Sequence, residues 1–138
     1  MNARPIPVPN DTTAPFWAAA GDHVLTLARC SNCSALTLPP EPVCGHCGST
    51  DREITFEPVD GAGVIRSWTV VRQSFLPGFD DDVPFVLVDV ELDAAEDVRL
   101  IGRFLDGIDA PLALGLAVDL AWEDLNDDVA LPAFRLRP

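Results

Sequence analysis

The chain contains no lysine and no tyrosine, and it has only two histidines among its 138 residues. Without lysine it cannot form a Schiff base, and without tyrosine it lacks one of the common acid catalysts. The sequence shows neither a glycine-rich phosphate loop nor a convincing set of serine or cysteine with histidine. We therefore predict that the chain is not an enzyme on its own.

Positive charge is also scarce. Nine arginines face 22 acidic residues, which gives a formal net charge of −13. A field of that sign repels nucleic-acid phosphates and anionic membranes. No apolar run is long enough to cross a bilayer, and the first residues lack the apolar core of a signal peptide. We expect a cytoplasmic protein with no nucleic-acid partner and no membrane partner.

All four cysteines lie in one window, residues 29–50, as two C-x2-C pairs separated by ten residues. Thiols stay reduced in the cytoplasm, so paired C-x2-C motifs indicate a metal site rather than disulfides. Four thiolates complete a tetrahedral shell and leave no open position for catalysis. We predict a structural zinc ion bound by Cys30, Cys33, Cys44 and Cys47. An iron site of the rubredoxin type is the alternative.

The segments around this window predict mostly strands. Thr13 and Pro15 indicate the start of a short helix that ends at Gly21, and residues 23–30 alternate as a strand that carries the first cysteine. Downstream, β-branched and aromatic residues predict five strands, at 63–75, 84–92, 98–105, 115–125 and 131–138. Five short strands suit a small closed barrel of the OB-fold type, with an open sandwich as the alternative.

Several short motifs follow one another along the chain: APFW, the first C-x2-C, LPPEPVCGHCGS, GAGVIRSWTVV, LPGFDDDVPFVLVDVELD and LPAFRLRP. In this order they resemble the family catalogued as domain of unknown function thirty-five, from about residue 15 to residue 138. The resemblance implies a mainly β fold, with an N-terminal helix and a rubredoxin-like zinc ribbon followed by a five-stranded OB-fold barrel. We expect an arm, short helix and lead-in strand over 1–28, the ribbon over 29–52 and the OB-fold over 53–138. The chain departs from the family at Ser34, where glycine is usual.

Members of that family are associated with acyl-CoA metabolism, commonly as small partners of thiolase-like condensing enzymes, acyltransferases and retro-aldolases. Some act in steroid side-chain breakdown, and others accompany MaoC-type enoyl-CoA hydratases. The resemblance implies a non-catalytic accessory subunit that binds or channels acyl-CoA in a hetero-oligomer with a thiolase-like or hydratase-like enzyme. Two other hypotheses stay open: a free-standing OB-fold that binds nucleic acid or another ligand, and an iron–thiolate electron carrier.

Arginines are the first candidate contacts for acyl-CoA. Coenzyme A is polyanionic, so a chain of this charge suits a site in which a partner supplies positive charge. Single arginines can still bind phosphates through paired hydrogen bonds. The candidates are Arg66 and Arg72, predicted on one face of the first barrel strand, and Arg103 on the third. Ordinary solvated strand faces are the alternative explanation for these arginines.

Aromatic side chains are the second set of candidates. Phe75 and Phe79 lie in the loop between the first two barrel strands, where OB-folds often present ligands. Phe16 and Trp17 lie on the predicted helix. Each pair either packs within its own domain or contacts a partner or an acyl chain. The aromatic candidates for contact with acyl-CoA or with a partner are therefore Phe75, Phe79, Phe16 and Trp17.

Overall fold

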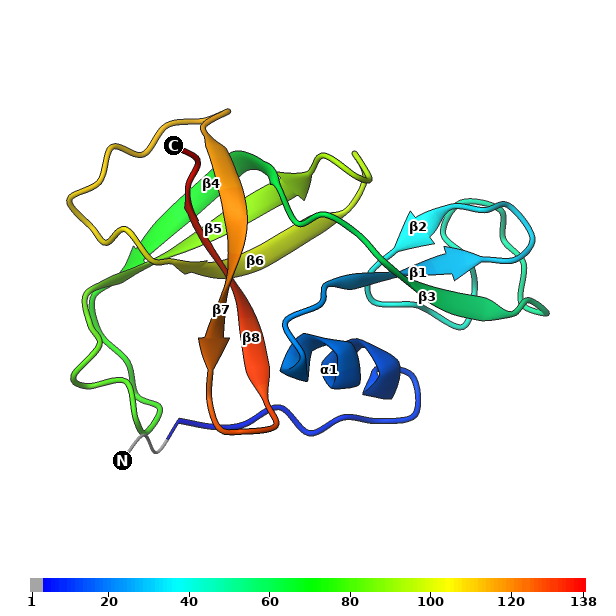
Figure 1. The fold of residues 1–138 in the computed structure, drawn as a ribbon, viewed down its shortest axis with the longest axis horizontal. Coiled ribbons are helices and arrows are strands. Elements are labelled where there is room, and N and C mark those ends of the chain that lie inside the picture. Colours follow the sequence, from blue (N-terminus) through cyan, green and yellow to red (C-terminus); the bar gives the residue numbers. More distant parts are fainter. Residues whose placement is uncertain (1–3) are drawn as a thin grey trace.

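The computed structural model describes residues 4–138 as a barrel and a small ribbon domain with one short helix between them (Figure 1). The ribbon forms one end of the elongated molecule, and the barrel forms the other. The helix, α1 (Ala14–Gly21), precedes eight strands, which confirms the prediction of a mainly β fold with one N-terminal helix. Among residues 4–138, no helix is both long enough and apolar enough to span a bilayer.

Helix α1 starts close to the predicted residue, but a different side chain accepts the hydrogen bonds from the backbone just before it. Thr13 occupies the N-cap position, yet its side chain makes no capping hydrogen bond. The Oδ1 atom of Asn10 instead accepts hydrogen bonds from the backbone N–H groups of Thr12 and Thr13, each at 2.9 Å. Pro15 lies within the first two helical positions, where its missing N–H is not needed.

The ribbon is a three-stranded antiparallel sheet. Its central strand is β1 (Thr26–Cys30), which pairs with β2 (Leu36–Thr37) on one side and with β3 (Ile54–Pro58) on the other. The sequence pattern did not predict β3. Because β3 pairs with β1 along its whole length, the ribbon sheet extends beyond residues 29–52 at both ends.

The barrel is closed by five strands in the order β4-β5-β6-β8-β7, which confirms the OB-fold barrel and excludes the open sandwich. Its strands are β4 (Gly63–Val71), β5 (Phe85–Leu92), β6 (Arg99–Phe104), β7 (Ala117–Asp124) and β8 (Ala130–Leu136). Strands β6 and β8 pair in parallel, and a short antiparallel pairing of β4 with β7 completes the closure.

Strand β4 carries a bulge that changes one prediction. The pairing with β5 shifts register between Ile65 and Ser67, so Arg66 lies at the irregularity. A bulge adds one residue and interrupts the alternation of side chains between the two faces. The strand also ends at Val71, which places Arg72 in the following loop. The prediction that Arg66 and Arg72 share one strand face is therefore wrong.

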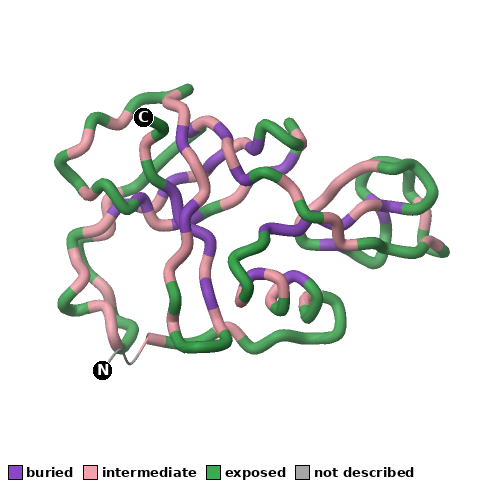
Figure 2. Tube along the Cα trace, in the orientation of Figure 1, coloured by how far each residue is buried: buried purple, intermediate pink, exposed green. Residues whose placement is uncertain are grey.

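One hydrophobic core joins the helix to the barrel. Buried residues concentrate in the barrel, in α1 and in the segment that leads into β1, whereas the far end of the ribbon is mostly exposed (Figure 2). Phe16, Leu25 and Leu27 belong to the same buried cluster as Phe104 and Phe134 of the barrel. The shared core holds α1 and the start of the ribbon against the barrel.

Close packing in the closed barrel predicts that a side chain at Gly63, the first residue of β4, destabilises the fold. A Cβ atom there would lie 2.3 Å from the backbone oxygen of Glu91 and 2.6 Å from a methyl carbon of Val90. We expect Gly63→Ala to lower the free energy of unfolding by about 1–3 kcal/mol, as overpacking does. Gly45→Ala is the control, because no atom lies within 4 Å of its Cβ position. Equal urea midpoints for the two variants would contradict this packing.

Candidate functional site

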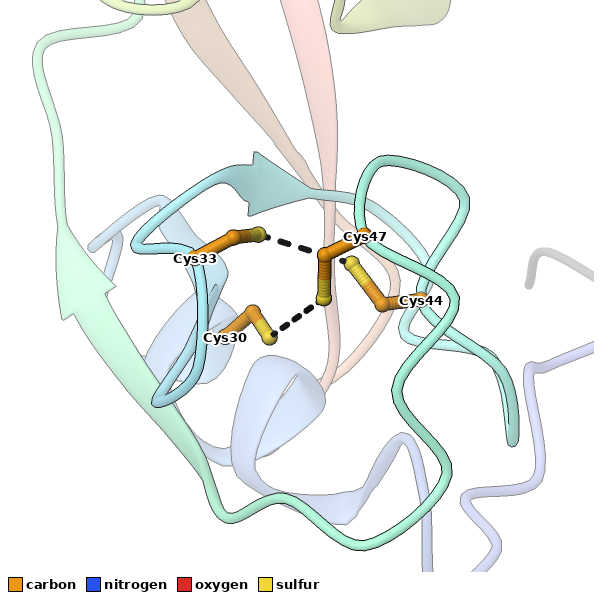
Figure 3. Close-up of side chains that lie close together, drawn as sticks. All are labelled: Cys30, Cys33, Cys44 and Cys47. Atoms are coloured by element: carbon orange, nitrogen blue, oxygen red, sulfur yellow. Dashed lines mark hydrogen bonds between the residues drawn. The ribbon is translucent and has the colours of Figure 1, made fainter.

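The four cysteines converge at the end of the ribbon (Figure 3). Cys30 ends β1 and Cys33 lies in the turn after it, while Cys44 and Cys47 come from the second loop. All four sulfur atoms lie within 4.8 Å of one another. The Sγ–Sγ distances are 3.9 Å for Cys30 and Cys47 and 3.7 Å for Cys33 and Cys44. Metal–sulfur bonds of about 2.3 Å in a tetrahedron place sulfurs about 3.8 Å apart, so the residues fit one tetrahedral metal ion.

The two cysteine turns have matching backbone geometry. The N–H of Ser34 donates to the carbonyl of Cys30, and the N–H of Gly48 donates to the carbonyl of Cys44, each at 2.9 Å. Both donors have positive φ, 66° at Ser34 and 74° at Gly48. Glycine adopts this conformation without a steric penalty, whereas a serine does not. Ser34, which stands where glycine is usual in the family, therefore introduces backbone strain into the first turn. All four ligands stay in place.

Hydrogen bonds to the sulfurs of Cys44 and Cys47 favour thiolates, the form that binds metal. The Asn32 side-chain amide donates to Cys47 Sγ at 3.3 Å and lowers the pKa of Cys47 to about 6. The backbone N–H groups of Cys47 and His46 lower the pKa of Cys44, with a 3.4 Å contact from His46. His46 thus contributes its backbone, and its side chain is not among the clustered ligands.

Arg52 holds the second cysteine loop in place. Its guanidinium group donates hydrogen bonds to the carbonyl oxygens of Glu41, Pro42 and Ser49, at 2.6, 3.1 and 3.0 Å. Cys30 and Cys44 are buried, whereas the other two cysteines lie nearer to solvent. A site with four protein ligands in a clamped loop has no open coordination position, so its geometry suits a structural role.

A second candidate site is a groove of about 590 Å³ between the ribbon, α1 and the barrel. We call it the apolar groove. Helix α1 contributes Phe16 and Trp17, the ribbon contributes residues 38–40, and the barrel contributes side chains such as Leu87 and Leu100 from β5 and β6. Concave, mostly apolar sites with a few polar groups are typical ligand sites, and they occur preferentially between domains.

The apolar groove has one polar end, built around Glu123 of β7. Glu123 Oε2 lies 3.3 Å from Arg4 Nη1 and 3.5 Å from Arg103 Nε. Arg103 Nη1 also donates to Asp82 Oδ2 at 3.3 Å. The Arg103 guanidinium stacks 4.2 Å from the centre of the Phe85 ring. These contacts restrain Arg103 at the edge of an otherwise apolar surface.

The structure brings together four of the seven predicted contact residues. Arg103, Phe79, Phe16 and Trp17 all line the apolar groove. The remaining three, Arg66, Arg72 and Phe75, are exposed and lie outside its lining.

Each of the three outlying residues has a different environment. Arg66 forms an ion pair with Glu91 at 2.8 Å on the outer face of the barrel. Arg72 lies in the β4–β5 loop, residues 72–84. Phe75, in the same loop, is 92% exposed, and its neighbour Leu76 lines the groove.

Two groove residues, Arg4 and Glu123, were not predicted. They contact each other across 119 residues of sequence. In the sequence, Glu123 is one polar residue of an alternating strand pattern, and no short motif connects it with Arg4.

Comparison with protein families matches both halves of the chain. The model of the ChsH2 rubredoxin-like zinc ribbon domain matches residues 17–53. The model of the ChsH2 C-terminal OB-fold domain matches residues 56–123. The first range covers most of α1 and strands β1 and β2 with the four cysteines, and the second covers part of β3, strands β4 to β6 and most of β7.

Known proteins similar to the chain include a subunit of an enzyme complex. The chain is 31% identical to a chain of the solved Ltp2-ChsH2(DUF35) aldolase, with a TM-score of 0.78 over 94% of this chain and 98% of that one. A DUF35 protein of unknown function from Sulfolobus solfataricus shares the fold, with 14% identity and a TM-score of 0.61 over 93% and 87% of the two chains.

A curated relative is named probable enoyl-CoA hydratase alpha subunit, from Thermomonospora curvata. It is 34% identical over 132 residues, which are 96% of this chain. The chain spans 40% of that relative's length. From the two domain matches and the near full-length similarity to the ChsH2 structure, we conclude that the chain belongs to the DUF35 family and has the zinc ribbon and OB-fold of ChsH2.

Proposed function

We propose that the chain is a non-catalytic accessory subunit that binds or channels an acyl-CoA substrate for a thiolase-like partner enzyme. The partner would be a condensing enzyme, an acyltransferase or a retro-aldolase, acting in lipid or steroid side-chain metabolism. The main support is the similarity over 94% of the chain to a component of the Ltp2-ChsH2(DUF35) aldolase. The apolar groove gives such a subunit a surface that could receive an apolar acyl group.

The placement of the reactive side chains supports a non-catalytic role. The four cysteines form the metal site. His23 pairs with Asp124 at 2.6 Å and stacks on Trp122, and His46 lies in the second cysteine loop. Neither histidine lines the apolar groove. A histidine base or a cysteine nucleophile at the groove would therefore come from the partner.

A hydratase-like partner is the second candidate. The 34% identity to a probable enoyl-CoA hydratase alpha subunit favours it, because that relative is named as one subunit of a hydratase. The same groove would then serve a MaoC-type hydratase. A nucleic-acid partner is disfavoured, since Arg29, Arg66, Arg99 and Arg137 all form ion pairs with carboxylates and leave little positive charge for phosphates.

We further propose that the ribbon holds zinc rather than iron. Both ions accept four thiolates, and the family matched by the ribbon is described as a zinc ribbon. A colourless protein with one zinc per chain is the expected result of absorption spectroscopy and elemental analysis. A coloured protein with a visible absorption band would support the iron–thiolate electron carrier instead.

Co-purification from the native host tests the proposed partner. A tagged chain should be recovered with a thiolase-like enzyme at near-equal stoichiometry, identified by mass spectrometry. Recovery with a hydratase-like enzyme would favour the second candidate. Recovery of the chain alone, or with RNA, would contradict both forms of the proposal and leave a free-standing binding module.

A further inference from the structure

We propose that the apolar groove binds the acyl part of the ligand and that Arg103 donates a hydrogen bond to the neutral carbonyl group next to the acyl chain. This inference rests on the proposed function and goes further, because it divides the ligand between two proteins. The acyl chain and its carbonyl would lie in the groove of this chain. The phosphate groups of coenzyme A would lie elsewhere, on the partner.

The first observation is a hydrogen-bond donor without an acceptor. An arginine side chain carries five N–H donors on three nitrogens. Arg103 uses Nη1 for Asp82 and directs Nε towards Glu123, at 3.3 and 3.5 Å. Its second terminal nitrogen, Nη2, makes no hydrogen bond to any residue between 4 and 138. Arg103 lines the groove and its side chain is 15% exposed, so we take Nη2 as the donor for an acceptor there.

The second observation is the balance of charge at the polar end. Within residues 4–138, the ion-paired groups at this end are two arginines, Arg4 and Arg103, and two carboxylates, Glu123 and Asp82. A phosphate bound there would meet two carboxylates without any surplus of positive charge. A neutral carbonyl oxygen needs only a donor, so the same cluster suits a thioester or ketone oxygen. Charge complementarity therefore selects the acyl end of an acyl-CoA over its nucleotide end.

The third observation is the rigidity and size of the site. Arg103 is fixed on strand β6 of the closed barrel, and its guanidinium is held between Asp82, Glu123 and the face of Phe85. A donor that is already oriented loses little freedom when a ligand binds. The volume of about 590 Å³ falls within the roughly 300–1,000 Å³ of small-molecule sites.

Two matched probes test the inference on the full chain with its metal bound. The first is decanoyl-N-acetylcysteamine, an acyl thioester without phosphate, and the second is the decyl thioether that lacks only the thioester carbonyl. Binding is followed through the indole N–H signal of Trp17, which lines the groove and is assigned with Trp17→Phe. We expect the thioester to bind about tenfold more tightly than the thioether, the value of one net hydrogen bond. Coenzyme A alone should leave the Trp17 signal unchanged.

Variants of Arg103 separate the hydrogen bond from general packing. Arg103→Lys keeps the charge but loses the planar guanidinium, and Arg103→Met keeps the apolar stem. Both should weaken thioester binding about tenfold and leave thioether binding unchanged. Arg99→Met is the control, because Arg99 lies on the same strand, pairs with Asp89 and does not line the groove. Ile101→Asp, at an exposed position of the groove wall, should weaken both probes even if the Arg103 variants do not fold.

Three outcomes would overturn the inference. They are equal affinity of the native chain for the two probes, an equal effect of Arg99→Met, and no binding of either probe. A groove that binds neither probe while the partner still co-purifies would contradict this inference and leave the proposed function standing. Probe binding without any enzyme partner would contradict the proposed function alone.

Discussion

Cys44→Ser should release the metal and unfold the ribbon, while the barrel stays folded. Metal binding stabilises zinc-finger peptides by about 10–16 kcal/mol, and such modules are unfolded without metal. Beyond β1 the ribbon has few buried side chains to hold it, because β2 has two residues and no residue of β3 is buried. The barrel has its own core, which includes Phe104 and Phe134. Unfolding should therefore be confined to the ribbon and should not extend into the barrel.

Elemental analysis and amide hydrogen exchange measure this effect together. Metal content should fall from one ion per chain to nearly none, and protection should disappear from β2 and β3 but remain in β5. His46→Ala is the matched control, since His46 lies in the same loop and its side chain is not among the ligands. A Cys44→Ser protein that keeps its full metal content and its ribbon protection would refute the structural role of the site.

Phe75→Asp should break the complex with the partner without affecting the fold. The Phe75 side chain is 92% exposed, and Leu76 beside it is 58% exposed, so the β4–β5 loop presents an apolar tip to solvent. Aromatic residues in the centre of an interface can each contribute about 2–4 kcal/mol. We expect the affinity for the partner to fall roughly 30- to 1,000-fold. The free energy of unfolding should change by less than about 0.5 kcal/mol.

Leu114→Asp provides the comparison for Phe75→Asp. Leu114 is 71% exposed and lies in the loop between β6 and β7, on another part of the barrel. Partner affinity is measured by calorimetry or surface plasmon resonance, and stability by urea unfolding. If Leu114→Asp weakens the complex and Phe75→Asp does not, the partner docks on the β6–β7 loop and the assignment of the β4–β5 loop is wrong.

The metal centre could be predicted from the sequence because its geometry is local. Two residues between paired cysteines place both sulfurs on one turn, so Cys30, Cys33, Cys44 and Cys47 were identified from spacing alone. The barrel strands were also predictable, since their alternation reflects burial of one face. The strand β3 was not, because Ile54–Pro58 is mostly exposed and forms part of the ribbon only by pairing with β1.

The apolar groove could not be predicted, because its walls come from distant parts of the chain. Its polar end joins Arg4 to Glu123 across 119 residues, and its apolar walls combine α1, the ribbon and the barrel. The sequence left two explanations for Phe16, as a core residue or as a site residue. In the structure Phe16 is 8% exposed and also lines the groove. Only the three-dimensional fold shows that Arg103 lines the groove, whereas Arg66 and Arg72 do not.

Turnover of the partner enzyme, measured with and without this chain, tests the central claim most directly. The substrate would be the acyl-CoA of the co-purified enzyme, and the two proteins would be mixed at equal concentration. We expect the chain alone to show no turnover and the partner to need the chain for full kcat/KM. Turnover by the chain alone, or a partner whose kcat/KM is the same without it, would contradict the accessory role.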